Sequence, residues 1–290
     1  MIKKGYLQAL KLIGVILFVF ILSRIDREQV RQTLQNADQA LLLASFTMLF
    51  VVYMIKTMRW HLLAKKAGAK TTLYESWKVY QIGIFFASFT PAKIGEFGRA
   101  IYLKKQGLQN IPAFGTAIFD RLADAVVIGI LTIPSLWILF GKVSAFVLAL
   151  SILVIVLLVF AFLQRTSIGK KILMVVPLLR LFLMTETAFL IFGFTMISWC
   201  AYYAWVLLLA QALHIQVDPL IMIATCTIAG IIALLPIAPS GLGTRDAAFI
   251  YFLAPFGILS EQAVSLAFVM FASILLSAVP GSIYWLKGLR

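Results

Sequence analysis

The chain has 290 residues, of which 62% are hydrophobic and only 12% are charged. A soluble domain carries about 25% charged residues, so this composition excludes a soluble globular fold and indicates a polytopic membrane protein built from helices. The net charge is +14, but the basic residues lie between the apolar runs, which is the pattern of cytoplasmic membrane loops rather than of a nucleic-acid-binding surface.

The first half contains three apolar runs of spanning length and one shorter run. Helices are expected at about 6–23, 39–57 and 112–140, the first as a retained helix rather than a cleaved signal peptide. A basic loop is expected at 58–78. The apolar stretch 79–90 is too short to span a hydrocarbon core of about 30 Å, so we expect it to form one arm of a re-entrant hairpin.

The second half repeats this organisation. Helices are expected at about 144–163, 187–213 and 262–286. An apolar run at 219–238 is followed by a Pro/Gly break, and 246–256 is interpreted as the returning arm.

A motif containing the break occurs once in each half. The two copies read SFTPAKIGEFGRAIYL and PIAPSGLGTRDAAFIYFL, and aligning Pro91 with Pro239 also aligns Gly95 with Gly243. Paired interrupted segments in the two halves of a membrane protein indicate a binding site near the bilayer midplane. These two broken elements are therefore the strongest functional signal in the sequence.

The predicted fold is an all-α polytopic membrane protein, with about six full transmembrane helices plus two re-entrant elements. The single transmembrane domain, 1–290, would be an inverted repeat of halves at about 1–143 and 144–290. With the N-terminus in the cytoplasm, the basic clusters and the C-terminus also fall inside, and the two elements enter from opposite faces. The alternative counts both elements as full spans, which gives eight.

Three charged residues follow the first break. Lys93, Glu96 and Arg99 share one face if the segment is helical. Because charge inside a bilayer costs from about 2.5 kcal/mol upward, such residues pair or line wet cavities. They are interpreted as an anion site in which the lysine and arginine hold a phosphate and the glutamate orients them; the alternative is an ordinary cytoplasmic loop.

A second charged group lies in the helix expected at 112–140. Asp120 and Asp124 are one turn apart, and Arg121 lies beside them. We expect a network with Lys93 or Arg99, with either a substrate or coupling-ion role or a structural role. In the second broken element, the candidate site residues are Ser240, Gly241, Gly243, Arg245 and Asp246, whose glycines allow close backbone approach to an anion.

Other polar residues are interpreted as structural. Arg59 and Trp60 are expected to form an interfacial anchor pair. Cys200 and Cys226 lie in apolar runs with no metal-ligand spacing, so no metal, disulfide or other cofactor is expected.

Three segments, GIFFASFTPAKIGEFGRAIYL, FDRLAD and LLPIAPSGLGTRDAAF, together resemble the transmembrane region of lysylphosphatidylglycerol synthases, also called the flippase-like domain family. The family pattern is roughly P-x-x-x-G-E-x-x-R, then R-x-x-D, then P-x-x-G-G-x-G-x-R-E. Asp246 stands where Glu is usual, and Ser240 with a single Gly241 replaces a frequent Gly pair, which leaves the turn geometry open. The matching residues are Pro91, Gly95, Glu96, Arg99, Arg121, Asp124, Pro239, Gly241, Gly243, Arg245 and Asp246.

The resemblance implies a lipid-handling membrane protein, and in the better-known members a flippase. Those members carry a soluble aminoacyl-transfer domain after the membrane region. No such domain follows the last expected helix here, so the chain is not expected to aminoacylate lipids by itself. Some relatives bear glycosyltransferase-associated names.

The function predicted is a flippase or transporter, not an enzyme, that moves a phospho- or polyprenyl-linked lipid across the cytoplasmic membrane. Phosphate would be contacted by Lys93, Arg99 and Arg245, and charge would be balanced by Glu96, Asp120 and Asp124. No nucleotide-binding G-x-x-x-x-G-K-[ST] motif is present, so gradients would drive transport. The alternatives are a membrane-embedded glycosyl- or phospho-transferase, or an accessory subunit of a lipid or cell-envelope synthesis complex. The expected partners are membrane lipids; a homodimer or an envelope-synthesis partner stays open.

Overall fold

The computed structural model is helical throughout the part of the chain that it describes, and no strand occurs there. The expected helix at 144–163 lies outside this part, as does the expected helix at 6–23 apart from Ser23. The all-α prediction is therefore confirmed for the remainder. The structure describes residues 23, 26–90, 93–141, 182, 186–233, 241 and 243–288.

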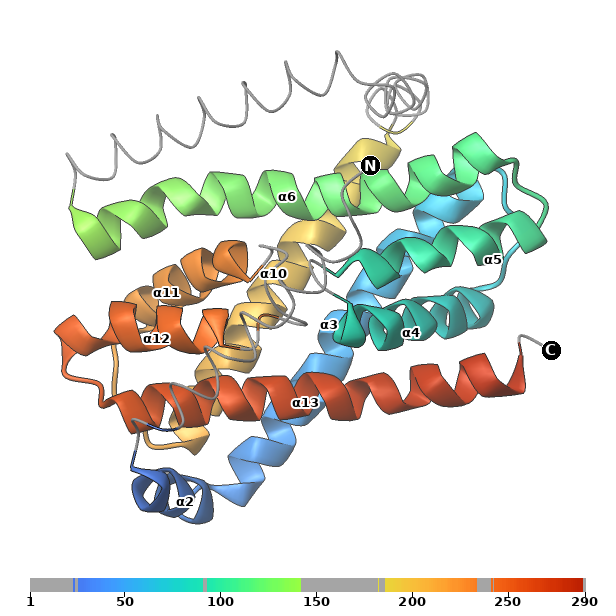
Figure 1. Cartoon of the computed structure of the whole chain (residues 1–290). Coiled ribbons are helices and arrows are strands. Elements are labelled where there is room, and N and C mark those ends of the chain that lie inside the picture. Colours follow the sequence, from blue (N-terminus) through green and yellow to red (C-terminus); the bar gives the residue numbers. More distant parts are fainter. Residues whose placement is uncertain are drawn as a thin grey trace, which may run out of the picture.

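Four long helices form the body of the described structure (Figure 1). Each is long and apolar enough to cross a membrane, which confirms a multi-pass membrane protein. The total number of spans stays a prediction. In Figure 1, α3 (Gln39–Lys66) and α10 (Thr187–Ala212) run side by side. They cross the other two long helices, α6 (Asn110–Phe140) and α13 (Ser260–Lys287), obliquely.

The first broken element is a helix, a sharp turn and a short return. It consists of α4 (Leu73–Phe89), the 3-10 helix η1 (Ile94–Gly98) and α5 (Arg99–Lys105). At the turn, Lys93 has the left-handed φ of 55°. Gly95 then lies against α4 so closely that an added Cβ would collide with the backbone carbonyl of Phe86. A residue without a side chain is therefore required for the return to pack on α4.

The second broken element also pairs a longer helix with a shorter one. It consists of α11 (Pro219–Ile232), which packs against α12 (Thr244–Leu253), followed by the 3-10 helix η2 (Ala254–Phe256). The connection at 234–240 lies outside the described residues.

The two broken elements lie at opposite ends of the bundle. Figure 1 shows α4 and α5 at one end and α11 and α12 at the other. The contacts of the two elements with α13 agree with this placement. The first element packs against Gly281 of α13, where an added Cβ would collide with the Gln81 carbonyl. The second element reaches α13 through the hydrogen bond from Arg245 to the carbonyl oxygen of Ala267. These positions are about 21 Å apart along a helix that rises 1.5 Å per residue. This placement supports the predicted inverted repeat, which, like the re-entrant depth of the elements, stays a prediction.

The prediction of a basic loop at 58–78 is wrong, because the loop is much shorter. Helix α3 continues to Lys66, and α4 already begins at Leu73. Because Trp60, Leu63 and Ala64 are buried, packing extends α3 past the apolar run that marked its expected end. The start of α4 is set by a capping box between Thr72 and Glu75.

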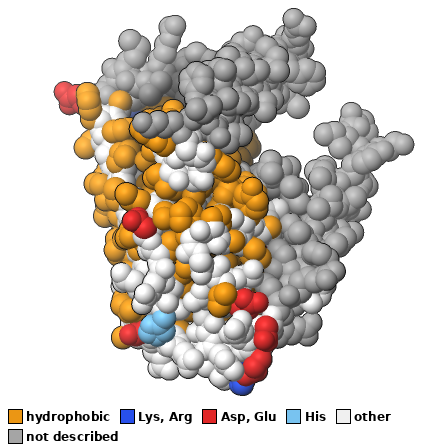
Figure 2. All heavy atoms as spheres, turned by 90° about the vertical axis from the view of Figure 1, so that its left-hand side faces the viewer, with side chains coloured by type: hydrophobic (Ala, Val, Ile, Leu, Met, Phe, Trp, Pro, Cys, Tyr) orange, Lys and Arg blue, Asp and Glu red, His pale blue; other side chains and the backbone are white. Residues whose placement is uncertain are grey.

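The outer surface is apolar over much of its height. Figure 2 shows hydrophobic side chains over the upper and middle parts of one face, with most of the charged side chains near its lower edge and a few acidic ones higher up. Large hydrophobic side chains such as Phe189 and Leu43 are exposed on the long helices. The short helix α2 (Arg27–Gln35) is polar and carries an exposed Arg31–Glu28 ion pair. This distribution fits helices that face lipid.

Candidate functional site

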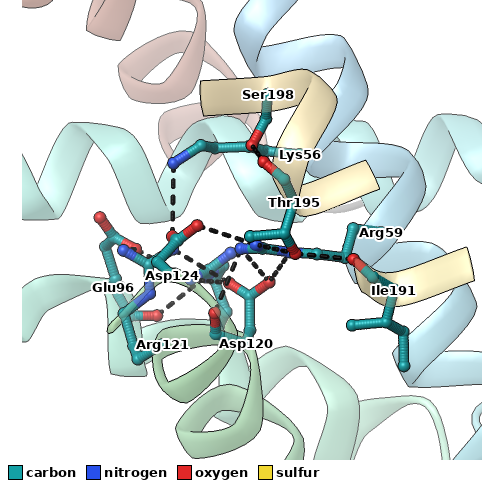
Figure 3. A network of polar contacts seen from close by, with 10 residues as sticks. Lys56, Arg59, Glu96, Asp120, Arg121, Asp124, Ile191, Thr195 and Ser198 are labelled. Carbon is teal, nitrogen blue, oxygen red and sulfur yellow. Dashed lines mark hydrogen bonds and ion pairs between the residues drawn. The ribbon is translucent and has the colours of Figure 1, made fainter. Parts of the chain in front are cut away.

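A network of ion pairs lies inside the bundle and joins α3, η1, α5 and α6 (Figure 3). Asp120 of α6, which is 0% exposed, is its centre. One carboxylate oxygen accepts a hydrogen bond from Arg59 Nε at 2.9 Å. The other is bound by Arg99 Nη2 at 3.0 Å and by Arg121 Nη2 at 3.1 Å. Three arginines from three helices therefore converge on one carboxylate.

Asp124, one turn further along α6, is bound by three cations as well. Arg59 Nη1 lies at 2.8 Å, Arg121 Nη2 at 3.0 Å and Lys56 Nζ at 3.3 Å. Arg59 Nη1 also donates to Thr195 Oγ1 of α10 at 2.9 Å. Arg59 thus ties α3 to both α6 and α10.

Glu96 connects the first broken element to this network. Its carboxylate is bound by Arg99 Nη2 at 2.9 Å and by Arg121 Nη1 at 2.8 Å. Glu96 lies in η1 and Arg99 directly follows it, and because a 3-10 helix has about three residues per turn, the two side chains lie on the same side. The expected network between the 112–140 helix and Arg99 is present.

Arg99 is held on all sides. Its guanidinium carbon lies 4.5 Å from the ring centroid of Trp60 and 4.6 Å from that of Tyr80, which is the geometry of two cation–π contacts. Its aliphatic stem passes over Gly83, where an added Cβ would be 2.7 Å from Cδ. Arg99 is buried as a result and does not line the cavity described next.

A cavity of about 370 Å³ adjoins the network. One part of its wall is charged, and the rest is apolar and rich in aromatic rings. Lys56 reaches into it with its ammonium 5.5 Å from the ring centroid of Trp199. The charged lining residues are Lys56, Lys93, Glu96, Arg121 and Asp124, and the aromatic ones are Tyr53, Tyr80, Phe97, Trp199, Tyr202 and Trp205.

The sequence interpretation of Arg59 and Trp60 as an interfacial anchor pair is wrong. Both side chains are fully buried, and Arg59 contacts two carboxylates. Lys56 was likewise missed as a site residue. The available signal was the three-residue spacing of Lys56 and Arg59 at the end of an apolar run, which puts two cations on one helix face.

The charged residues of the second broken element have different partners. Arg245 is buried and donates from Nη2 to the carbonyl oxygen of Ala267 at 3.1 Å. Asp246 is buried and accepts from the Gly243 amide at 2.7 Å, which caps α12. Gly241 and Gly243 have φ of 76° and 80°.

The structure does not bring all the predicted residues together. Arg245 and Asp246 form no ion pair with any described residue and do not line the cavity. Pro91, Pro239 and Ser240 lie outside the described residues. Within the described part of the chain, no group of three His, Cys, Asp or Glu side chains is placed to hold a metal ion.

The bundle, its buried charge network and the adjoining cavity define a polytopic membrane protein with an internal polar site. The chain belongs to the family described as the lysylphosphatidylglycerol synthase TM region, whose model matches residues 8–281. The resemblance drawn from the motifs is thereby confirmed. Over 121 residues the chain is 28% identical to the UPF0104 membrane protein MJ1595 of Methanocaldococcus jannaschii. That match covers 39% of this chain and 35% of the relative, about a third of its length.

Proposed function

We propose that this protein is a flippase or transporter that moves a phosphate-containing lipid across the cytoplasmic membrane. The observation that carries the proposal is the cavity, whose lining combines charged side chains with aromatic and aliphatic ones. Its charged wall suits a phosphate head group, and its aromatic and apolar wall suits the adjoining hydrocarbon. Such a cavity lets a head group cross among polar side chains while the acyl tails stay in the bilayer.

The network supports this role energetically. A lipid head group crossing bare hydrocarbon loses its hydration, and a single charge at a helix centre already costs about 2.5–3.5 kcal/mol by insertion scales. Here Glu96, Arg121 and Asp124 of the cavity wall are held in place by ion pairs to one another, and Glu96 also by the buried Arg99. Because these groups are oriented before the lipid arrives, less free energy is lost in ordering them.

The roles proposed for the site residues follow from their exposure. Lys56 and Lys93 line the cavity and would contact the phosphate, whereas Arg121 lines it while paired with three carboxylates. Arg99 is enclosed by Glu96, Asp120 and two aromatic rings, so we propose that it orients Glu96 rather than reaching the head group. Arg245, on the opposite element, would contact the head group when the site opens to the other face.

Leaflet exchange in liposomes tests the proposal. The purified protein is reconstituted with fluorescent anionic, zwitterionic or polyprenyl-phosphate lipids, and exchange is followed by quenching of the outer leaflet. We expect head-group-selective exchange that is lost in Glu96→Gln and Arg99→Ala. The matched control is Glu28→Gln on the exposed helix α2, which should keep the parent rate. If a folded parent exchanges none of these lipids, the transport proposal fails, and the transferase and accessory-subunit alternatives gain.

A further inference from the structure

The charges around the cavity do not balance. The described cations in the network and cavity wall number five and the carboxylates three, an excess of two positive charges. Uncompensated charge is costly inside a bundle that faces lipid, so such an excess favours binding of an anion. The cations are Lys56, Arg59, Lys93, Arg99 and Arg121, and the carboxylates are Glu96, Asp120 and Asp124.

Among the cations that line the cavity, the two lysines have the fewest carboxylate partners, whereas Arg121 pairs with three. Arg59 and Arg99 are each bound to two carboxylates and are at most 1% exposed. Lys56 has a single carboxylate partner, at 3.3 Å, and its side chain is 17% exposed. Lys93 is exposed, lines the cavity and has no ion-pair partner among the described residues. A lysine ammonium carries three donors on a flexible stem, so both can reorient toward a ligand.

The lysines reach the cavity from different elements. Lys56 lies on α3, and Lys93 lies at the turn that precedes η1. An anion bound between them would therefore join the long helix to the first broken element. The three arginines would stay in their ion pairs.

Two further observations restrict the ligand. The cavity, at about 370 Å³, is within the size range of small-molecule sites and has room for a phosphate and the carbons next to it. The remaining wall is apolar and aromatic, with residues such as Ile84, Ile128 and Tyr202, which suits hydrocarbon next to the phosphate rather than a free ion.

We infer that this cavity binds a lipid whose head group ends in a phosphomonoester, with the phosphate held between Lys56 and Lys93. A phosphomonoester carries a charge of about −1.5 to −2 at pH 7, which matches the excess, whereas a phosphodiester carries only one negative charge. The inference rests on the proposed function, since it narrows the class of phosphate-containing lipid that the site takes.

Binding to the purified full-length protein in uncharged detergent tests the inference. Phosphatidic acid and phosphatidylmethanol with identical acyl chains differ only by a methyl group on the phosphate, which removes the second charge. At pH 7.5 we expect phosphatidic acid to bind at least about tenfold more tightly, because the second charge lies beside two ammonium groups. The preference should vanish as the pH falls through about 6, where the monoester loses that charge.

Variants assign the preference to the lysines. Lys56→Gln and Lys93→Gln should each lower phosphatidic acid affinity toward that of phosphatidylmethanol and leave the latter little changed. Lys56→Arg keeps the charge and should keep the preference, which separates loss of charge from misfolding. Lys66→Gln, at the exposed end of the same helix, is the matched control and should bind as the parent does.

The outcomes separate this inference from the transport proposal. Equal affinity for the two lipids at pH 7.5 overturns the inference, even if both are exchanged between leaflets. Selective binding without leaflet exchange supports the inference and contradicts transport. If inorganic phosphate displaces phosphatidic acid at concentrations as low as those of the lipid itself, the site takes free phosphate and the lipid assignment is overturned.

Discussion

The two broken elements share a sequence motif but differ in what their charged residues contact. Glu96 and Arg99 of the first pair with Arg121 and Asp120 on a separate long helix. In the second, Arg245 and Asp246 bond to backbone groups. A repeated motif therefore determines where the chain breaks, whereas its neighbours determine what its charges do.

Each element has one close glycine contact, but the two are not at equivalent positions of the motif, since Gly95 aligns with Gly243 and Lys93 aligns with Gly241. In the first, Gly95 lies against Phe86; in the second, a Cβ added at Gly241 would be 2.6 Å from Cβ of Ala233. In both, the returning segment packs on the preceding helix through a residue without a side chain. The two elements therefore differ mainly in the contacts made by the charged side chains that follow the turn.

The largest loss of stability is expected for substitution of Arg59, which pairs with two carboxylates of the buried network. Arg59→Met removes a fully buried cation that pairs with both Asp120 and Asp124, and breaking a buried ion pair on one side costs about 3–5 kcal/mol. The free energy of unfolding in mixed micelles measures this. Arg31→Met breaks an ion pair whose side chains are 59% and 54% exposed, so it should cost less than about 1 kcal/mol. Equal losses would contradict a buried network.

A large difference in stability is also expected between substitutions of Asp120, in the buried network, and of Asp246, in the second element. Asp120→Asn removes the charge that three arginines share and should cost about 3 kcal/mol or more. Asp246→Asn keeps an oxygen that can accept from the Gly243 amide and should cost about 1 kcal/mol. Denaturation midpoints of the two variants check the difference. A loss for Asp246→Asn as large as that for Asp120→Asn would show that the second element also depends on charge pairing.

A smaller effect is expected at the turn of the first element. Gly95→Ala must displace the Phe86 backbone, and overpacking of this kind costs about 1–3 kcal/mol. Gly98→Ala, in the same 3-10 helix, meets nothing within 4 Å and should be neutral or stabilising by up to about 1 kcal/mol. Thermal unfolding of the two variants decides the matter. If both behave alike, close packing of the return on α4 is not what stabilises the turn.

The smallest loss of stability is expected for substitution of the residues that cap the first helix of each element. The two caps should contribute about equally. Thr72 accepts from the Glu75 amide at the start of α4, and Asp218 accepts from the Leu220 amide at the start of α11. Thr72→Ala and Asp218→Ala should each cost about 1 kcal/mol, the usual value of a helix cap. Unfolding of both variants under one condition tests this. Unequal losses would show that one cap has tertiary partners.

Much of the helical framework could be predicted from the sequence. Helices expected at 112–140, 187–213 and 262–286 were found at Asn110–Phe140, Thr187–Ala212 and Ser260–Lys287. Their ends lie within a few residues of prediction because long apolar runs are bounded there by polar or helix-breaking residues. The end of α3 was missed because Arg59 is a charged residue that the fold buries.

The sequence by itself determined that this is a helical membrane protein with two Pro/Gly-broken elements, and it identified Glu96, Arg99, Asp120 and Asp124 as residues of interest. Composition and periodicity are sufficient for that, because they act within a single helix. Only the tertiary structure decided that Arg59 lies between Asp120 and Asp124, which are 61 and 65 residues away along the chain. The pairing of each cation with its carboxylate depends on how the helices pack against one another. The spacing of residues within one helix does not determine that packing.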